Sequence, residues 1–241
     1  MEYLNDAGLL IEQPDNMYKF SSDAVALGNF VQCKASDTVI DVGCGTGVLS
    51  LLVSYNHQPR EMICVDINPD ATTQIQKNIA LNQDKLTQTQ FTVLNTDARN
   101  LHKQLNNKVA DVIICNPPYF TTGKKSTNPH KNLARHDDTL SLTELATLCT
   151  KNLKYGGTVY FCYPANQLAK AIAIFENDNY RIKKIKLLSN HKGVYLAIFQ
   201  CKKGGGHHTT MLVWRNNRGR DKFRIRRCRV RPHDKCFWWR C

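Results

Sequence analysis

The chain has 241 residues, 42% of them hydrophobic and 22% charged, which is enough for one α/β domain with a full core and a small appendage. It contains no apolar run long enough for a transmembrane helix, and its first residues lack the basic and apolar regions of a signal peptide, so we expect a cytoplasmic protein that does not bind membranes. The formal net charge of +13 is uneven, because residues 204–241 hold eleven Lys/Arg and two Asp; the charge is therefore weak evidence about the partners of residues 1–203.

Residues 1–35 form the lead-in segment, by which we mean the N-terminal part of the chain before the first strand of the predicted sheet. Gly8–Gln13 is typical of a short strand, and Ala24–Val31 of an apolar helix with Ser22 or Asp23 as its N-cap. The segment is too short to bury a core of its own, so we assign it to the domain that follows.

A strand and a glycine-rich turn come next. Thr38–Val42 is a β-branched run that predicts a buried strand, and it carries an acid, Asp41. Three alternating glycines follow before a helix that starts near Val48: Gly43, Gly45 and Gly47. They permit a tight turn and a close approach of a ligand to the backbone, next to the N–H groups of a helix N-terminus. The spacing differs from the Gly-x-Gly-x-x-Gly of dinucleotide sites.

Two further strands also end in an acid. Glu61–Asn68 carries Asp66 near its end. The Asp66 carboxylate can either accept hydrogen bonds from two ribose hydroxyls or cap the helix that begins at Pro69. Gln90–Ala98 ends with Asp97, for which a cap on a short helix near residues 100–105 is the structural alternative.

The segment Ala110–Phe120 combines a buried strand with an abrupt stop. Its two consecutive prolines remove two backbone donors, so the motif Asn116-Pro117-Pro118-Tyr119 follows directly at the carboxyl end of the strand. Open α/β sheets bind ligands at that end. A proline-rich turn that merely ends a strand is the alternative.

The rest of residues 36–203 continues the alternation of helices and strands. Residues 121–131 predict a loop, and Ser141 with Glu144 forms a capping-box pattern at the start of a helix that reaches about Leu153. The remaining elements are a strand, a helix and a final hairpin of two strands, at Thr158–Tyr163, Ala165–Asn177, Tyr180–Leu188 and Val194–Lys202.

Taken together, the glycine turn, the strand-end acids and Asn-Pro-Pro-Tyr resemble the class I methyltransferases that use S-adenosylmethionine. The resemblance implies an α/β, Rossmann-like sheet of seven mostly parallel strands with helices on both faces and an antiparallel last strand. It also implies how the cofactor is bound: its amino-acid part by the glycine turn and Asp41, its ribose by Asp66, and its adenine by Asp97.

Phe20 with Asp23 before the first strand, and Ala134-Arg135-His136 after the loop, narrow the resemblance to the bacterial adenine-N6 methyltransferases that modify valine tRNA beside the anticodon. This implies tRNA as partner, a monomer and no metal ion. The Asn116 side-chain oxygen and the Pro117 carbonyl could each accept a hydrogen bond from the adenine amino group, and Tyr119 could stack on the base. The resemblance implies that four further residues line the substrate site: Phe120, Phe20, Arg135 and His136.

Three alternatives stay open. Glutamine-N5 methyltransferases of release factors carry the same tetrapeptide but have a helical domain before the glycine turn, for which only about forty residues are present here. DNA adenine methyltransferases have a separate recognition domain, for which no segment is large enough. The alternative to an enzyme is an RNA-binding protein built on a methyltransferase scaffold.

Residues 204–241 differ in composition from the preceding chain. The first 203 residues use eighteen Lys and four Arg, whereas this tail uses two Lys and nine Arg and holds all three tryptophans. The tail is therefore either a basic RNA-binding arm or the product of a reading-frame change, and we expect it to lie outside the fold. A metal knuckle is a third hypothesis, but the spacing of the candidate ligands matches no common zinc pattern: His207, His208, Cys228, His233, Cys236 and Cys241.

Overall fold

The computed structural model describes residues 2–4, 8–17, 19–117, 140–204 and 210–215. Their strands are β1 (Glu2–Tyr3), β2 (Leu10–Ile11), β3 (Thr38–Val42), β4 (Glu61–Asp66), β5 (Gln90–Asn95), β6 (Ala110–Cys115), β7 (Leu153–Pro164), β8 (Tyr180–Asn190), β9 (Gly193–Lys203) and β10 (Thr210–Arg215). Their helices are α1 (Ser22–Gly28), α2 (Val48–His57), α3 (Pro69–Leu81), η1 (Ala98–Asn100), α4 (Leu101–Gln104), α6 (Leu142–Asn152), η2 (Ala165–Gln167) and α7 (Leu168–Asn177).

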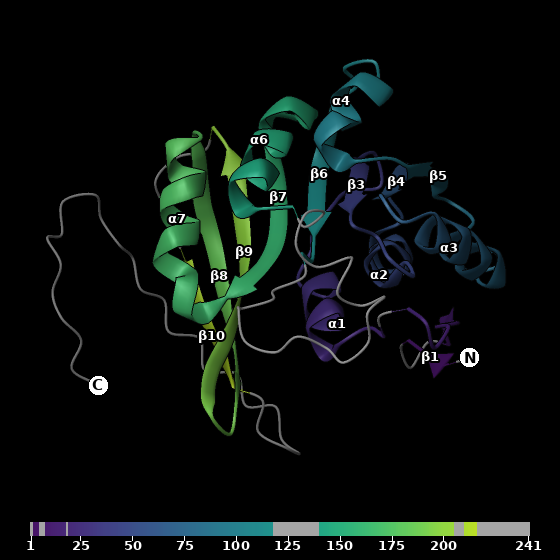
Figure 1. Ribbon diagram of the computed structural model, residues 1–241, viewed down its shortest axis with the longest axis horizontal. Helices are drawn as coiled ribbons and strands as arrows, with labels where there is room; N and C mark the ends of the chain where they lie inside the picture. Colours follow the sequence, from purple (N-terminus) through teal and green to yellow (C-terminus); the bar gives the residue numbers. More distant parts are fainter. Residues whose placement is uncertain (1, 5–7, 18, 118–139, 205–209, 216–241) are drawn as a thin grey trace, which may run out of the picture.

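One large sheet organises these elements (Figure 1), with the strand order β10-β8-β9-β7-β6-β3-β4-β5. β5, β4, β3, β6 and β7 are parallel to one another, and β9 runs antiparallel to both β7 and β8. All seven predicted strands are present, and the expected fold class with its antiparallel last strand is confirmed.

The eighth strand was not predicted. β10 pairs in parallel with β8, from Thr210 opposite Lys184 to Arg215 opposite Ser189. These six residues belong to the tail that we expected to lie outside the fold, so that expectation does not hold for them. Residues 216–241, and with them most of the basic tail, lie outside the described residues.

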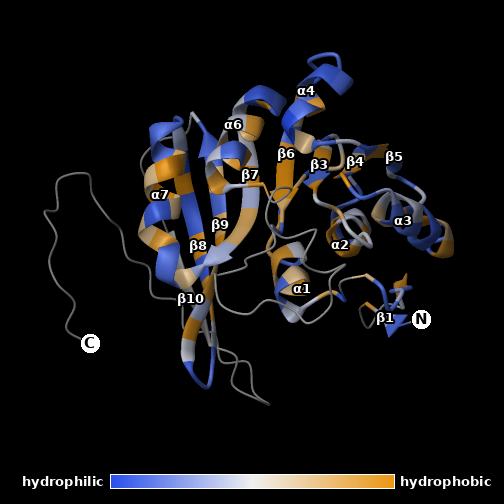
Figure 2. Ribbon diagram, viewed as in Figure 1, coloured by the Kyte–Doolittle hydropathy of each residue, from blue (hydrophilic) through white to orange (hydrophobic). Residues whose placement is uncertain are grey.

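Helices cover both faces of the sheet, and Figure 2 shows the hydrophobic strands between them. On one face, α1, α2 and α3 pack against a cluster that includes Leu27, Leu49 and Ile75. On the other face, α4, α6 and α7 pack against a cluster that includes Leu101 and Phe175. The central strands are buried on both faces, which explains why β3, β4 and β6 are nearly continuous apolar runs.

Two predicted boundaries were wrong. α1 begins at Ser22, so its N-cap position is Ser21 and neither Ser22 nor Asp23. β7 begins at Leu153, five residues before the predicted start at Thr158, and passes through Gly156 and Gly157. A Cβ atom at Gly157 would lie 2.9 Å from the Asp111 carbonyl oxygen, so the glycine is needed for close contact with β6.

The seven cysteines of residues 1–203 are free, and all except Cys33 are buried, so they pack as small apolar core residues. Among the described residues, no helix has both the length and the apolar character needed to cross a membrane.

Candidate functional site

Most of the predicted site residues that the structure describes lie at the carboxyl edge of the parallel strands. Val42 pairs with Val65 on one side and with Cys115 on the other, and Asp66 pairs with Asn95. The residues that follow β3, β4, β5 and β6 therefore lie side by side. The glycine turn is at the centre of this edge, with the Asp66 carboxylate on one side and Asn116 on the other.

The glycine turn is fixed to β4 and open on its other side. The N–H groups of Gly43 and Cys44 both donate to the Val65 carbonyl oxygen, at 2.8 and 3.0 Å. The three glycines have φ of +72°, +54° and +93°, which side chains rarely adopt. A Cβ atom at Gly47 would lie 2.6 Å from Ile75 Cγ1, whereas a Cβ atom at Gly43 or Gly45 would meet no atom of the described residues within 4 Å. The turn thus leaves room for a ligand above its first two glycines.

Asp66 connects this turn to helix α3. Its Oδ2 accepts the Gly45 N–H at 2.9 Å, and its Oδ1 accepts the Asn68 N–H at 2.9 Å. The helix cap itself is Asn68, whose side chain accepts the Asp70 N–H, so the capping alternative for Asp66 is wrong. Burial raises the pKa of Asp66, although its hydrogen bonds to backbone N–H groups oppose the rise.

Asp41 is fully buried beneath the turn. Its Oδ2 accepts a hydrogen bond of 2.6 Å from the Ser50 hydroxyl on α2, whereas its Oδ1 is buried and has no hydrogen-bond partner among the residues that the structure describes. Burial, together with the nearby Asp66 charge, raises the pKa of Asp41 to about 7. A buried acid with an unsatisfied oxygen is costly, and a cationic group placed next to it would satisfy it.

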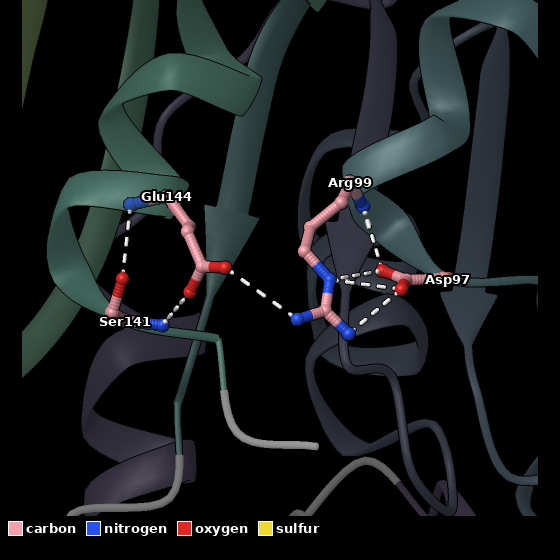
Figure 3. A network of polar contacts seen from close by, with 4 residues as sticks. All are labelled: Asp97, Arg99, Ser141 and Glu144. Carbon is pink, nitrogen blue, oxygen red and sulfur yellow. Dashed lines mark hydrogen bonds and ion pairs between the residues drawn. The ribbon is translucent and has the colours of Figure 1, made fainter. Parts of the chain in front are cut away.

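Asp97 lies at the end of β5 in a polar network with α6 (Figure 3). It is the N-cap of η1, and its carboxylate accepts hydrogen bonds from the Arg99 backbone and from Arg99 Nε at 2.8–2.9 Å. Arg99 also reaches Glu144 Oε1 at 3.4 Å, and Glu144 completes the predicted capping box with Ser141. Hydrogen bonds from Arg99 lower the pKa of Asp97, so this acid is ionised near neutral pH. Asp97 thus caps the 3-10 helix η1, whereas the N-cap of the predicted helix near residues 100–105, which is α4, is Asn100.

Sequence reasoning missed a set of amides on α3. Asn78 Nδ2 donates to the carbonyl oxygens of Thr46 at 2.8 Å and of Glu12 at 3.0 Å, and Asn78 Oδ1 accepts the Glu12 N–H. Asn82 binds the backbone of Leu10 in the same way. These fully buried amides join the lead-in segment to the glycine turn. The available signal was two asparagines four residues apart, which share one face of a helix.

The proposed substrate residues are only partly described. Asn116 is half-buried and Pro117 buried, directly after β6. The Phe20 N–H donates to Gln13 Oε1 at 2.7 Å, and the Phe20 ring packs against the cluster that contains Leu9 and Leu51. The other four predicted residues lie outside the described residues: Tyr119, Phe120, Arg135 and His136. The six candidate metal ligands of the tail lie outside them as well, and within the described ranges no three His, Cys, Asp or Glu side chains form a group that could hold a metal ion.

The chain is similar in sequence to known methyltransferases. The family model described as "Methyltransferase small domain" matches residues 21–159. The tRNA1(Val) (adenine(37)-N6)-methyltransferase of Vibrio campbellii is 28% identical over 187 residues, covering 76% of this chain and 75% of its own. The proteins of the same name from Parabacteroides distasonis and Shewanella frigidimarina are 32% and 33% identical; they cover 67% and 63% of this chain, and the matched parts are 66% and 61% of their own lengths.

Solved structures show the same fold at low identity. A predicted O-methyltransferase from Agrobacterium tumefaciens has a TM-score of 0.63 at 15% identity, covering 83% of this chain and 91% of its own. A methyltransferase from Pyrococcus furiosus has a TM-score of 0.57 at 15% identity, covering 82% of this chain and 90% of its own.

Proposed function

We propose that this chain, which belongs to the methyltransferase small domain family, transfers a methyl group from S-adenosylmethionine to N6 of an adenine in tRNA, and that adenine 37 of a valine tRNA is its substrate. The observation that carries the proposal is the position of Asn116 and Pro117, which lie at the sheet edge beside an open glycine turn. The printed activity of the relatives supports the choice of adenine and of tRNA.

The described edge fits the proposed cofactor. The bound cofactor supplies an electrophilic methyl group on a sulfonium centre. The space above Gly43 and Gly45 accommodates its amino-acid part, and Asp41 offers a buried, unsatisfied oxygen for its positive amino group. Asp66 and Asp97, at the ends of β4 and β5, are assigned to its ribose and its adenine. Gly47 has a different task, because it keeps α2 close to α3 at Ile75.

Asn116 and Pro117 are assigned to the reacting nitrogen. The lone pair of the adenine amino group is delocalised into the ring, which makes the nitrogen a poor nucleophile. Two hydrogen bonds, donated by the amino N–H groups to the Asn116 side-chain oxygen and the Pro117 carbonyl oxygen, favour a pyramidal nitrogen and direct its lone pair. Pro117 has no N–H, so its backbone offers only an acceptor.

No strong general base is required, because the proton can leave after the methyl group has been transferred. A base that is stacked in RNA must first be turned out of the stack. Tyr119 and Phe120 are assigned to that base, and Phe20, Arg135 and His136 to the surrounding RNA, on the sequence alone. An enzyme of this kind works in the cytoplasm, where tRNA is found, and we propose that it acts as a monomer.

The test offers labelled S-adenosylmethionine and four acceptors to the purified chain: valine tRNA, the same tRNA with guanine at position 37, a release factor, and duplex DNA. We expect label in the first acceptor alone. Label in the release factor but not in tRNA would transfer the assignment to glutamine-N5 methylation. Label in none, with cofactor binding intact, would leave an RNA-binding protein on a methyltransferase scaffold.

The Asn116→Ala variant tests the mechanism. We expect kcat to fall by much more than tenfold while the cofactor affinity, measured by calorimetry, stays within a few-fold of wild type, because the lost acceptor acts on the substrate. A kcat above about a tenth of wild type would limit the contribution of Asn116 to about 1.4 kcal/mol and contradict its central role. Asn100→Ala is the matched control, since Asn100 is exposed and its side chain caps no helix.

A further inference from the structure

The charge of the chain before its tail is concentrated in one element. Residues 180–203, which form β8, β9 and their turn, hold seven Lys/Arg and no Asp or Glu. Residues 1–179 hold fifteen Lys/Arg and eighteen Asp/Glu, a balance of −3. The hairpin is therefore the basic part of an otherwise slightly acidic body, which the net charge of the whole chain conceals.

Strand alternation places most of these cations on one face. Phe199 and Cys201 belong to the core under α6 and α7, so Gln200 and Lys202, which alternate with them, face the side of α1. Gln200 Nε2 confirms this orientation, since it donates to the Tyr160 hydroxyl at 3.0 Å, and Tyr160 packs at 6.1 Å against the Phe30 ring beside α1.

The cross-strand partners on this face define a basic stripe. Arg181 pairs with Lys202, Lys184 with Gln200, and Lys186 with Ile198. Lys192 lies in the turn that joins the two strands. The basic stripe consists of Arg181, Lys184, Lys186, Lys202 and, at its end, Lys192. At about 3.3 Å per residue it is roughly 30 Å long, enough to follow several successive phosphates of a nucleic acid.

The stripe leads to the edge that holds the candidate site. β8 runs parallel to β7, and Lys186 and Cys162 both pair with Ile198 of β9, so they lie at the same level of the sheet. On β6, Cys115 pairs with Phe161, so the residue after Cys115 lies level with Cys162. Lys186 is thus level with Asn116, and Asn190 lies about 13 Å farther out at 3.3 Å per residue. Figure 1 shows this hairpin end projecting beyond the sheet on the side where α1 lies.

The side chains on the stripe are held in position and crowded. Lys186 Nζ lies 5.9 Å from the centre of the Phe30 ring. Burial and the positive charges of Lys202 and Arg181 lower the pKa of the neighbouring Lys183. Near the turn, the Tyr195 hydroxyl donates to Asp23 at 2.7 Å, which connects the hairpin to α1, while residue Tyr195 stays 39% exposed. Crowded cations beside an exposed aromatic ring suit a polyanion with bases.

We propose that the basic stripe is the docking surface for the sugar–phosphate backbone of the tRNA, with the projecting turn next to the nucleotides that approach Asn116. The proposal rests on the proposed function for the identity of the RNA. It concerns binding, however, and can be tested without the methyl transfer.

The experiment measures binding of unmodified valine tRNA to the full chain by fluorescence anisotropy at several salt concentrations. The test variant is Lys184→Glu with Lys202→Glu, both exposed. The matched control is Lys77→Glu with Lys103→Glu, exposed on α3 and α4, which changes the net charge equally. We expect at least tenfold weaker binding for the test variant and a change below about threefold for the control. The slope of log affinity against log salt should fall by about 1.4–1.8 for two lost phosphate contacts.

Melting temperatures of both variants show whether they are folded. The milder double variant Lys184→Gln with Lys202→Gln removes the same charges without adding negative ones. The test variant should reach the wild-type kcat at saturating tRNA, and its KM for tRNA should be higher. Equal losses in test and control variants, or unchanged tRNA binding in the test variant, would overturn the proposal. So would a loss of release-factor binding with tRNA binding intact. Binding of tRNA through the stripe without any methylation would support the docking surface while refuting the proposed function.

Discussion

The two ends of the strand order differ in direction and in charge. The strands β3, β4, β5 and β6 are parallel, and the edge where they end holds acids, of which Asp66 accepts a hydrogen bond from the glycine turn and Asp41 one from Ser50 on α2. At β8 and β9 the sheet becomes antiparallel, and its residues carry seven cations and no acid. One sheet thus has an acidic edge on its parallel strands and a basic surface on its antiparallel hairpin.

This separation has an electrostatic consequence. Phosphates are repelled by the acidic edge and attracted by the hairpin, so the charge distribution orients a polyanion before any specific contact forms. The formal charge of +13 hides this difference, because most of it comes from the tail. If the acidic edge binds the cofactor, substitutions in it should change cofactor affinity. If the tail is independent of both regions, its removal should change neither Tm nor site-specific methylation.

The largest effect on stability is expected at Gly47. Gly47→Ala places a Cβ atom 2.6 Å from Ile75 Cγ1 at a φ of +93°, so we expect the free energy of unfolding to fall by about 2–4 kcal/mol. Gly45→Ala has only the conformational cost of about 1–2 kcal/mol, since its Cβ atom meets nothing.

For cofactor affinity, measured on the folded fraction of each variant, we expect the opposite order, with the larger loss in Gly45→Ala. Gly45→Ala projects a methyl group into the space assigned to the cofactor, so the folded variant should bind S-adenosylmethionine at least about tenfold more weakly. Chemical denaturation and calorimetry measure the two quantities. Unchanged cofactor affinity in folded Gly45→Ala would show that the space above the turn is not the binding site.

A smaller effect on stability is expected from pH at Asp41. Its folded pKa of about 7 lies above the ordinary value, so its contribution to stability is present below about pH 4 and is lost as the pH rises toward 7. Asp41→Asn removes this titration. The decrease in Tm between pH 5 and pH 8 should shrink by several degrees, since 1 kcal/mol corresponds to about 2–4 °C in a domain of this size.

Asp70→Asn is the control for Asp41, because Asp70 is an exposed acid in the first turn of α3. Cofactor binding adds a second readout: wild-type affinity should increase from pH 6 to pH 8 as Asp41 loses its proton to pair with a positive amino group. Identical pH profiles of wild type and Asp41→Asn would contradict the role assigned to this acid.

The smallest effect is expected from the tail. Removal of residues 216–241 should leave Tm and site-specific methylation unchanged and should weaken only the salt-dependent attraction of RNA. Removal of residues 207–241 also deletes β10, an edge strand that pairs with β8 alone, and we expect little further loss. Loss of methylation at fixed ionic strength after the shorter deletion would make the tail a recognition element. Unfolding after the longer deletion would make β10 part of the domain.

The sequence determined the strands, their alternation with helices and the location of the site. Apolar runs, glycines and prolines act within a few residues, since they set the allowed φ and ψ or remove a donor. Asp41, Asp66, Asp97 and Asn116 each follow such a local signal, and parallel strands bring their ends to one edge whatever the details of packing.

Only the tertiary structure decided what these residues contact. Asp97 is joined through Arg99 to Glu144, 45 residues away from Arg99, and Asn78 to Glu12, 66 residues away. The stripe depends on which face of β8 is covered, and an irregularity between Ile182 and Lys184 shifts the alternation there. Likewise, β10 pairs with the edge of β8 that faces away from β9. Such contacts depend on register and packing between distant segments, which no local pattern of residues encodes.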